Sequence, residues 1–283
     1  MIRMLLLFFT SALLLNATST LWKLEHKGHS LYLAGSIHLL RQSDYPLPKA
    51  YDKAYQDVTK LVLEADANAL NSPKMQMLFA KKMMLQEGKN LKKLLSSKTF
   101  LRLDSVCSSS GIPLNAMLGF KPSMVMIMVM QMKFAQLGID GEGVDSYYFN
   151  KAQHDAKPVE TFESIEEQIG FLAKMGAGDE EAFVRYSLDD MDKLQEQFAL
   201  MVKYWRGGEL VKLNDFLYES LKNFDESLYD NLIGKRNANW LPIIESYIKS
   251  PEREMIIVGA AHLVGLRGII ETLKSRGYKV TQW

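Results

Sequence analysis

Cysteine is almost absent from this chain. Cys107 is the only cysteine among 283 residues, so no disulfide can form within the chain. It lies in the polar stretch SVCSSSG, where we expect a partly buried small residue and not a catalytic nucleophile. A protein of this length can bury a core large enough to do without disulfides, even in an oxidising compartment.

An excess of charge of either sign is also missing. Lys and Arg total 34 and Asp and Glu total 33, for a formal net charge of +1. This balance gives no reason to expect nucleic acid or an anionic membrane surface as a partner. The sequence has no HExxH segment either, which excludes a zincin-type protease.

Apolar runs long enough to span a membrane are missing, but a shorter one lies at the N-terminus. A basic start, MIRM, precedes an apolar segment from Leu5 to Leu15, and the small residues Ala17 and Ser19 follow it. This order predicts a secretory signal peptide over residues 1–19, because the apolar run is too short to span about 30 Å of hydrocarbon. We therefore expect cleavage after Ser19 and a periplasmic or secreted domain over residues 20–283, with no transmembrane anchor.

A GxxH pattern follows two apolar runs that are far apart in the sequence. The run LYLAGSIHL carries Gly35 and His38, and the run EMIIVGAAHL carries Gly259 and His262. Short apolar runs are typical of strands buried on both faces, and ligands bind where the carboxyl ends of parallel strands meet. Two imidazoles there would supply half of a metal site. On the pattern alone, two unrelated histidines that lie at strand ends explain the repeated GxxH pattern as well as a shared site does.

A second strand is expected to bring acidic side chains to the same end of the sheet. The segment LVLEAD follows a helix that starts near Pro48, so it completes a strand–helix–strand unit with a right-handed crossover. Alternation along the strand puts Glu64 and Asp66 on one face, at the sheet end that carries His38. Buried carboxylates there need a cation or another partner. A strand end at which both carboxylates are exposed to water explains the two residues as well as a cation site does.

The middle of the chain is predicted to be helical. Residues 74–137 contain no parallel-strand pattern, and the methionine-rich stretch 124–132 is apolar all round, so it should be buried. With strands on either side, this arrangement predicts an α/β fold. We expect a compact core with a mainly parallel or mixed sheet flanked by helices, two GxxH-bearing halves brought together, and a large helical insertion.

Further polar residues lie where predicted strands and helices meet. A glycine-rich turn places Asp145 at a helix start, and the strand KPVETF carries Glu160. The segment SIEE forms a capping box, so the preceding Glu163 is expected to be a carboxylate favoured at a helix start. Arg236 and Asn237 lie in a later helix. A surface arginine is the usual case at such a position, and the alternative is that Arg236 pairs with a carboxylate or a substrate carbonyl.

Several longer motifs in order resemble the TraB/GumN family, which is related to the Tiki metalloproteases and, more distantly, to erythromycin-esterase and ChaN-like proteins. The resemblance covers nearly the whole mature chain. It departs from the family at Ser123, where tryptophan is frequent, and at Lys235, where glutamate is frequent. The matching motifs are LWKL, GSIHLL, YPLP, LVLEAD, GVD, KPVETFESIEEQ, RNANW and VGAAHLVG with RGYKV.

The resemblance implies a divalent-metal site at His38, His262 and Glu64, in which the two GxxH halves meet. It therefore predicts a metal-dependent hydrolase that cleaves an amide bond in a peptide or protein, with Glu64 as third ligand or general base. Mixed imidazole and carboxylate ligation admits Zn, Mn or Co. Arg236 or the backbone near Gly35 would stabilise the oxyanion. The supporting residues are Gly35, Gly259, Asp66, Asp145, Glu160 and Asn237.

Two other hypotheses remain beside the hydrolase. One is a non-catalytic metal- or haem-binding protein, and the other is a regulatory envelope protein that binds a partner through its helical middle. The substrate, the metal and the oligomeric state are left open by the sequence.

Overall fold

The computed structural model describes residues 19–189, 191–222 and 229–283. It has a mixed six-stranded sheet with strand order β6-β4-β7-β2-β1-β8. The strands are β1 (Leu21–His26), β2 (His29–Ser36), β4 (Lys60–Leu63), β6 (Val159–Thr161), β7 (Glu254–Gly259) and β8 (Lys279–Gln282). The predicted α/β class is therefore confirmed.

The two apolar runs that precede the GxxH histidines are neighbouring parallel strands. β2 pairs with β7 so that Gly35 lies opposite Val258 and Ser36 lies opposite Gly259. β4 pairs with the other side of β7 in the same direction, with Leu63 opposite Ile257. Three strand ends therefore meet at one edge of the sheet, as the sequence pattern predicts.

The remaining strands extend this parallel centre on both sides. β1 forms a hairpin with β2, and β8 is an edge strand, antiparallel to β1. β6 is parallel to β4 and forms the other edge. The crossover from β2 to β4 runs through α1 (Lys49–Asp57), but β7 lies between the two strands in the sheet.

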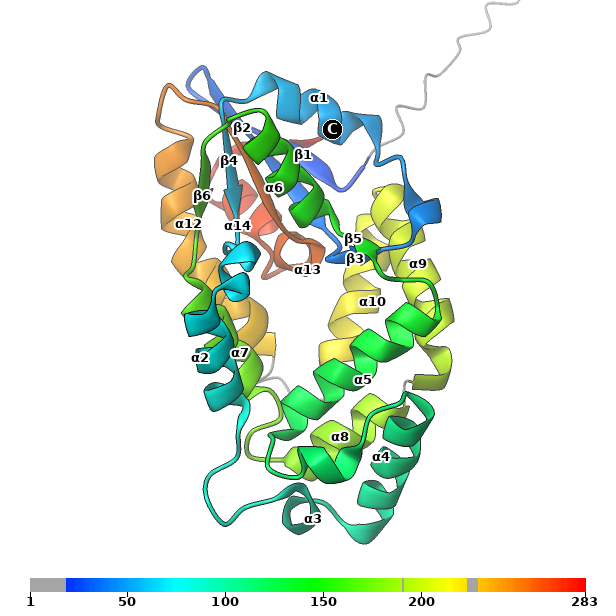
Figure 1. Cartoon of the computed structure of the whole chain (residues 1–283). Helices are drawn as coiled ribbons and strands as arrows, with labels where there is room; N and C mark the ends of the chain where they lie inside the picture. The colour runs from blue at the N-terminus through cyan, green and yellow to red at the C-terminus, as the bar shows by residue number, and fades with distance from the viewer. Residues whose placement is uncertain (1–18, 190, 223–228) are drawn as a thin grey trace, which may run out of the picture.

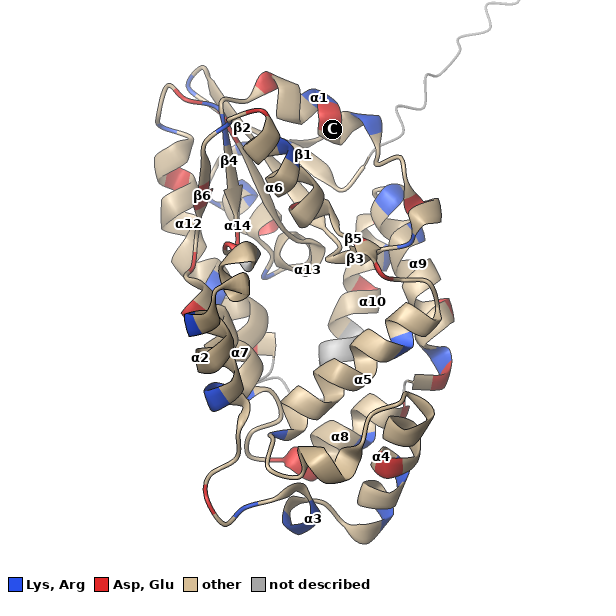
Figure 2. Ribbon diagram, in the orientation of Figure 1, with Lys and Arg blue, Asp and Glu red and all other residues tan. Residues whose placement is uncertain are grey.

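Helices cover both faces of the sheet (Figure 1). α6 (Val144–His154) lies in front of the strands in this view and α14 (Ile269–Ser275) lies behind them, while α12 (Lys235–Tyr247) lies along one side. Their apolar side chains join those of the strands in one core that includes Trp22, Tyr51 and Trp240. Acidic and basic residues are interspersed over the face shown in Figure 2.

The predicted helical middle forms the part of the molecule opposite the sheet in Figure 1. It has its own hydrophobic cluster, in which Leu103, Val125 and Val184 are fully buried. The helices of the middle and of the chain after it are α2 (Pro73–Met83), α3 (Leu91–Leu94), α4 (Ser97–Ser109), α5 (Pro122–Gln136), α7 (Ile165–Lys174), α8 (Glu180–Asp189), α9 (Leu194–Arg206) and α10 (Leu210–Lys222).

Two local predictions need correction. β4 ends at Leu63, so Glu64 and Asp66 follow the strand instead of alternating along it. The methionine-rich stretch is not buried all round: Val125 and Val129 are fully buried, but Met132 on the same helix is 41% exposed. One face of α5 packs against α7 and α8, and the other borders a cavity.

Residues 1–18, which make up nearly all of the predicted signal peptide, lie outside the described part of the chain. Ser19 is buried, and its backbone N–H donates to the carbonyl of Trp283. Among the residues that are described, no helix combines the length and apolar character that crossing a membrane requires.

Candidate functional site

Three predicted ligand residues converge on Gly259, the last residue of β7. A methyl group built on Gly259 would lie 3.3 Å from Glu64 Oε1, 3.6 Å from His38 Nε2 and 3.7 Å from His262 Cδ2. Because the two imidazole atoms lie 3.6 and 3.7 Å from one point, they are at most 7.3 Å apart. The glycine therefore leaves a space toward which two rings and a carboxylate converge.

His262 lies on α13 (Ala260–Leu263), directly after β7, and is 3% exposed. Its Nδ1 is 2.7 Å from the side-chain oxygen of Asn237 on α12. The amide nitrogen of Asn237 donates to two backbone carbonyls, those of His262 and Arg267, so the amide oxygen faces the ring. Nδ1 therefore carries the hydrogen, and the lone pair of Nε2 is directed away from Asn237.

Burial also decides the charge of His262. Removal from water lowers its pKa to about 4, although the nearby carboxylate of Glu64 acts in the opposite direction. At neutral pH the ring is therefore uncharged. A neutral imidazole with a free Nε2 is the form that binds a metal ion.

His38 follows β2 and is held at the opposite side of the space. Its Nδ1 is 3.2 Å from Asp145 Oδ1, and that oxygen also accepts a 2.5 Å hydrogen bond from Ser36. The charge of Asp145 raises the pKa of His38 to about 9. The side chain is 64% exposed, so surrounding water weakens this effect. An ion would bind the ring by displacing the proton on Nε2.

Glu64 connects the space to the rest of the site. Its Oε1 accepts a 2.6 Å hydrogen bond from the backbone N–H of Gly259, and its Oε2 lies 2.5 Å from Arg236 Nη2. Gln168 on α7 also donates to Oε2, at 3.3 Å. Burial alone would raise the pKa of Glu64, but His262, His38 and Arg236 together lower it to about 2. The group is therefore a carboxylate at neutral pH.

Arg236 on α12 lies between the acidic residues and His262. Its Nη2 also binds Glu163, at 2.8 Å, and its Nη1 is 3.1 Å from His262 Nε2. The guanidinium stacks over the ring of Trp240, whose Nε1 donates to Glu163. Arg236 therefore donates to the same nitrogen that an ion would use.

Several of these residues, but not His262, line an open cavity of about 410 Å³ at the carboxyl ends of the strands. The cavity is reached from solvent on the side of His38, which is the most exposed of the three predicted ligands. The residues that line it and that take part in the contacts above are Ser36, His38, Glu64, Asp145, Gln168, Arg236 and Gly259.

The donor types fit a divalent transition-metal ion, but the donors are already hydrogen-bonded. His262 Nε2 and Glu64 Oε1 are 3.9 Å apart, close enough for both to reach one ion at about 2 Å per bond. Within the part of the chain that the structure describes, no three His, Cys, Asp or Glu residues form an assembled metal-ligand group. For His262 to bind an ion, Arg236 must turn away from Nε2.

Three predicted supporting residues lie outside this space. The Gly35 N–H donates to the carbonyl of Thr20 at 2.8 Å, so it is not available to an oxyanion. Asp66 accepts a hydrogen bond from the Asn68 backbone and caps a short 3₁₀ helix, η2 (Ala67–Asn71). Glu160 is 46% exposed and pairs with Lys60 on β4.

One important residue of the site was assigned another role from the sequence. Glu163 was expected to be a helix-start carboxylate, but the cap of α7 is Ser164 with Glu167, and Glu163 is buried against Arg236 and Trp240. It follows β6, so the strand-end argument that selected Glu64 also applies to it. Asn237 and Asp145, by contrast, were selected, and each contacts one of the two histidines.

The two departures from the family pattern do not contact the three predicted ligands. Lys235 binds the side chain of Asn231 at 2.7 Å. Ser123 is fully buried on α5 and donates to the sulfur of Met83.

Comparisons with known proteins agree with the motifs. The model of the TraB/PrgY/gumN family matches residues 20–282. The uncharacterized protein YbaP of Escherichia coli (strain K12) is 27% identical over 245 residues, which cover 86% of this chain and 87% of that protein. YbaP of Shigella flexneri matches to the same extent. No solved structure matches the chain. The chain belongs to the TraB/PrgY/gumN family.

Proposed function

We propose that this protein is a metal-dependent hydrolase that cleaves an amide bond in a peptide or protein. The observation that carries the proposal is the convergence of Glu64 Oε1, His38 Nε2 and the His262 ring on the space above Gly259. Each side chain comes from the end of a different parallel strand or from the helix that follows it, which is where α/β sheets bind ligands.

In this proposal His38, His262 and Glu64 hold a divalent ion, which would be Mn, Co or Zn. Such an ion, when bound, polarises the carbonyl of the substrate and lowers the pKa of a bound water. Glu64 serves either as the third ligand or as the general base that takes a proton from water. It is ionised at neutral pH, which both roles require, and one oxygen is close to His262.

The neighbouring residues position these groups. Asp145 orients the ring of His38 and Asn237 orients the ring of His262, as carboxylates and carbonyls do beside metal-binding imidazoles. Arg236 is the cation that lines the same cavity, so it is placed to stabilise negative charge developing on the carbonyl oxygen. Glu163 keeps the guanidinium near this position through paired hydrogen bonds.

The proposal includes export. The N-terminal sequence pattern supports a location in the periplasm or outside the cell, where peptide or protein substrates would reach the cavity.

The test uses the purified protein loaded in turn with Zn, Mn and Co. We expect about one equivalent of metal and cleavage of a peptide library, both lost in His38→Ala and in His262→Ala. His154→Ala is the matched control, since His154 is 88% exposed and lies at the far end of α6. Metal retained by both site variants would overturn the ligand assignment.

One observation favours a second candidate, a binding protein without turnover. Arg236 already donates to His262 Nε2 and to Glu64, so the described donors are satisfied by protein groups. Binding of metal without cleavage of any peptide would support this candidate. A Soret band on addition of haem would identify haem as its ligand.

A further inference from the structure

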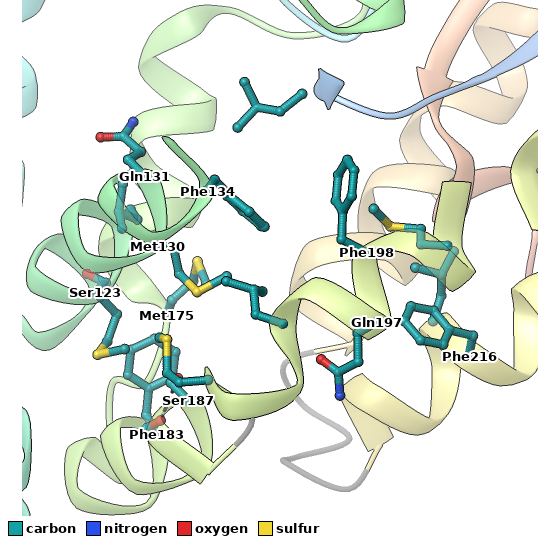
Figure 3. A pocket seen from close by; sticks show the side chains of 17 residues that line it. Ser123, Met130, Gln131, Phe134, Met175, Phe183, Ser187, Gln197, Phe198 and Phe216 are labelled. Carbon is teal, nitrogen blue, oxygen red and sulfur yellow. Dashed lines mark hydrogen bonds between the residues drawn. The ribbon is translucent and has the colours of Figure 1, made fainter. Parts of the chain in front are cut away.

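A large cavity in the helical middle is lined only by uncharged side chains. Its volume is about 560 Å³, within the range of ligand pockets. Figure 3 shows side chains from two groups of helices pointing toward one another across it. None of the 17 described residues that line it is Asp, Glu, Lys, Arg or His. Five are methionines: Met126, Met130, Met175, Met191 and Met201.

This cavity is linked to the candidate site through a smaller cavity that shares lining residues with both. A neck of about 280 Å³ shares part of its lining with the cavity, including Phe134 and Phe198, whose ring centroids are 6.0 Å apart. At its other end the neck is lined by His38 and Gly259, the residues at which the predicted ligands converge. A ligand that occupies the candidate site can therefore extend into the methionine-lined cavity.

The lining selects a hydrocarbon chain over a peptide segment. A peptide would bring backbone N–H and C=O groups into the cavity, and leaving them without partners is costly. Four of the lining residues are polar, and the hydroxyls of Ser123 and Ser187 are already bonded, to the sulfur of Met83 and the carbonyl of Phe183. The amides of Gln131 and Gln197 are too few to satisfy the N–H and C=O groups of a peptide segment that fills the cavity. A hydrocarbon chain has no such groups, and flexible methionine side chains adapt to its shape.

We propose that the methionine-lined cavity and its neck bind the fatty acyl chain of an N-acylated substrate, with the acyl carbonyl beside Gly259. This inference rests on the proposed function and specifies its substrate class. The polar amine half would lie in the cavity that contains Glu64 and Arg236. Hydrolysis breaks the bond between the carbonyl carbon and nitrogen. The hydroxyl of water joins the acyl carbon and its proton goes to the amine, so a fatty acid and an amine are released.

The binding test uses the purified full chain and cis-parinaric acid, a fatty acid whose fluorescence increases in apolar surroundings. We expect saturable binding that Met130→Glu weakens at least about tenfold, because a buried charge without a partner is unfavourable. Met132→Glu is the matched control on the same helix, since Met132 is 41% exposed and does not line the cavity. Met201 lines both the cavity and its neck, so Met201→Trp fills the place where they meet with an apolar group. This variant is also expected to weaken binding of the probe.

Competition separates the acyl chain from other occupants. We expect N-dodecanoylglycine to displace the probe better than an uncharged apolar peptide of similar size, including one copied from residues 5–15 of the chain. Better displacement by either peptide would overturn the acyl assignment. Binding that does not saturate, or that Met132→Glu weakens as much as Met130→Glu does, would overturn the cavity assignment.

A variant outside the cavity separates this inference from the proposed function. Glu64→Gln is expected to abolish hydrolysis of N-dodecanoylglycine and to leave probe binding unchanged, since Glu64 lines neither the cavity nor its neck. Probe binding without hydrolysis of any amide by the wild type would support the acyl site and contradict the proposed hydrolase. Peptide hydrolysis without probe binding would contradict the acyl site alone.

Discussion

Asn237 holds the ring of His262 through a 2.7 Å hydrogen bond between its side-chain oxygen and Nδ1. The same amide donates to the backbone carbonyls of His262 and Arg267, so one side chain connects α12 to α13 and to the loop after it. The orientation of the imidazole is therefore set by a residue 25 positions away in the sequence.

Asn237→Ala should affect both binding and stability. Without the amide, the ring loses the partner that keeps the proton on Nδ1, and we expect divalent-metal affinity to fall by about 10–100-fold. The buried carbonyl of His262 and the partly buried carbonyl of Arg267 also lose a donor, so the free energy of unfolding should fall by about 1–3 kcal/mol. Calorimetric titration and urea denaturation measure the two effects. Asn150→Ala, on the exposed side of α6, should leave both unchanged.

Arg236→Met should be strongly destabilising. The guanidinium is 10% exposed and pairs with Glu64 and Glu163, so its removal leaves two buried carboxylates close together. We expect a loss of about 3–5 kcal/mol in the free energy of unfolding. The control is Arg276→Met, which removes a partly exposed ion pair with Glu245 and should cost less than about 1 kcal/mol. Equal losses in the two variants would contradict the central position assigned to Arg236.

Gly259→Ala and Gly35→Ala should separate function from stability. The added methyl at Gly259 lies 3.3 Å from Glu64 Oε1 and enters the proposed ion space, so we expect loss of metal binding with a stability change below about 1 kcal/mol. At Gly35 the methyl would lie 2.4 Å from the Thr20 side chain, and overpacking should cost about 1–3 kcal/mol. Metal titration and thermal unfolding of both variants check the contrast. Full metal binding by Gly259→Ala would place the ion elsewhere.

Glu254, at the start of β7, should make stability depend on pH. It is 1% exposed and its Oε2 has no hydrogen-bond partner among the described residues. Burial raises the pKa of Glu254 above the usual 4.5, with Lys60 acting in the opposite direction. The folded state thus keeps the proton to a higher pH than the unfolded state. Stability should therefore decrease as pH rises from about 4.5 through the folded pKa.

Glu254→Gln removes this ionisation. We expect the variant to be about 1 kcal/mol more stable than the wild type at pH 7 and to show a flatter pH dependence above about pH 4.5. Urea denaturation at a series of pH values measures both. Glu271→Gln, at a half-exposed helical carboxylate, is the control and should follow the wild-type curve. A variant less stable than the wild type at pH 7 would show that the Glu254 carboxylate is stabilising.

Much of the sheet and part of the site could be predicted from local pattern. Apolar runs that end in Gly35 and Gly259 indicated two buried strands, and parallel strands bring such ends together, so His38 and His262 were expected to meet. The structure places both rings around Gly259. Glu163 was assigned to a helix start because the capping-box signal beside it is strong, although that cap is formed by Ser164.

The sequence by itself determined which segments form the buried strands and which polar residues follow them, because apolar periodicity and chain direction act locally. Only the tertiary structure decided that Arg236 lies between Glu64 and His262, and that one face of α5 borders an apolar cavity whose neck is lined by His38 and Gly259. Both depend on distances between elements that are far apart in the chain. No local pattern encodes those distances, because they follow from how the whole core packs.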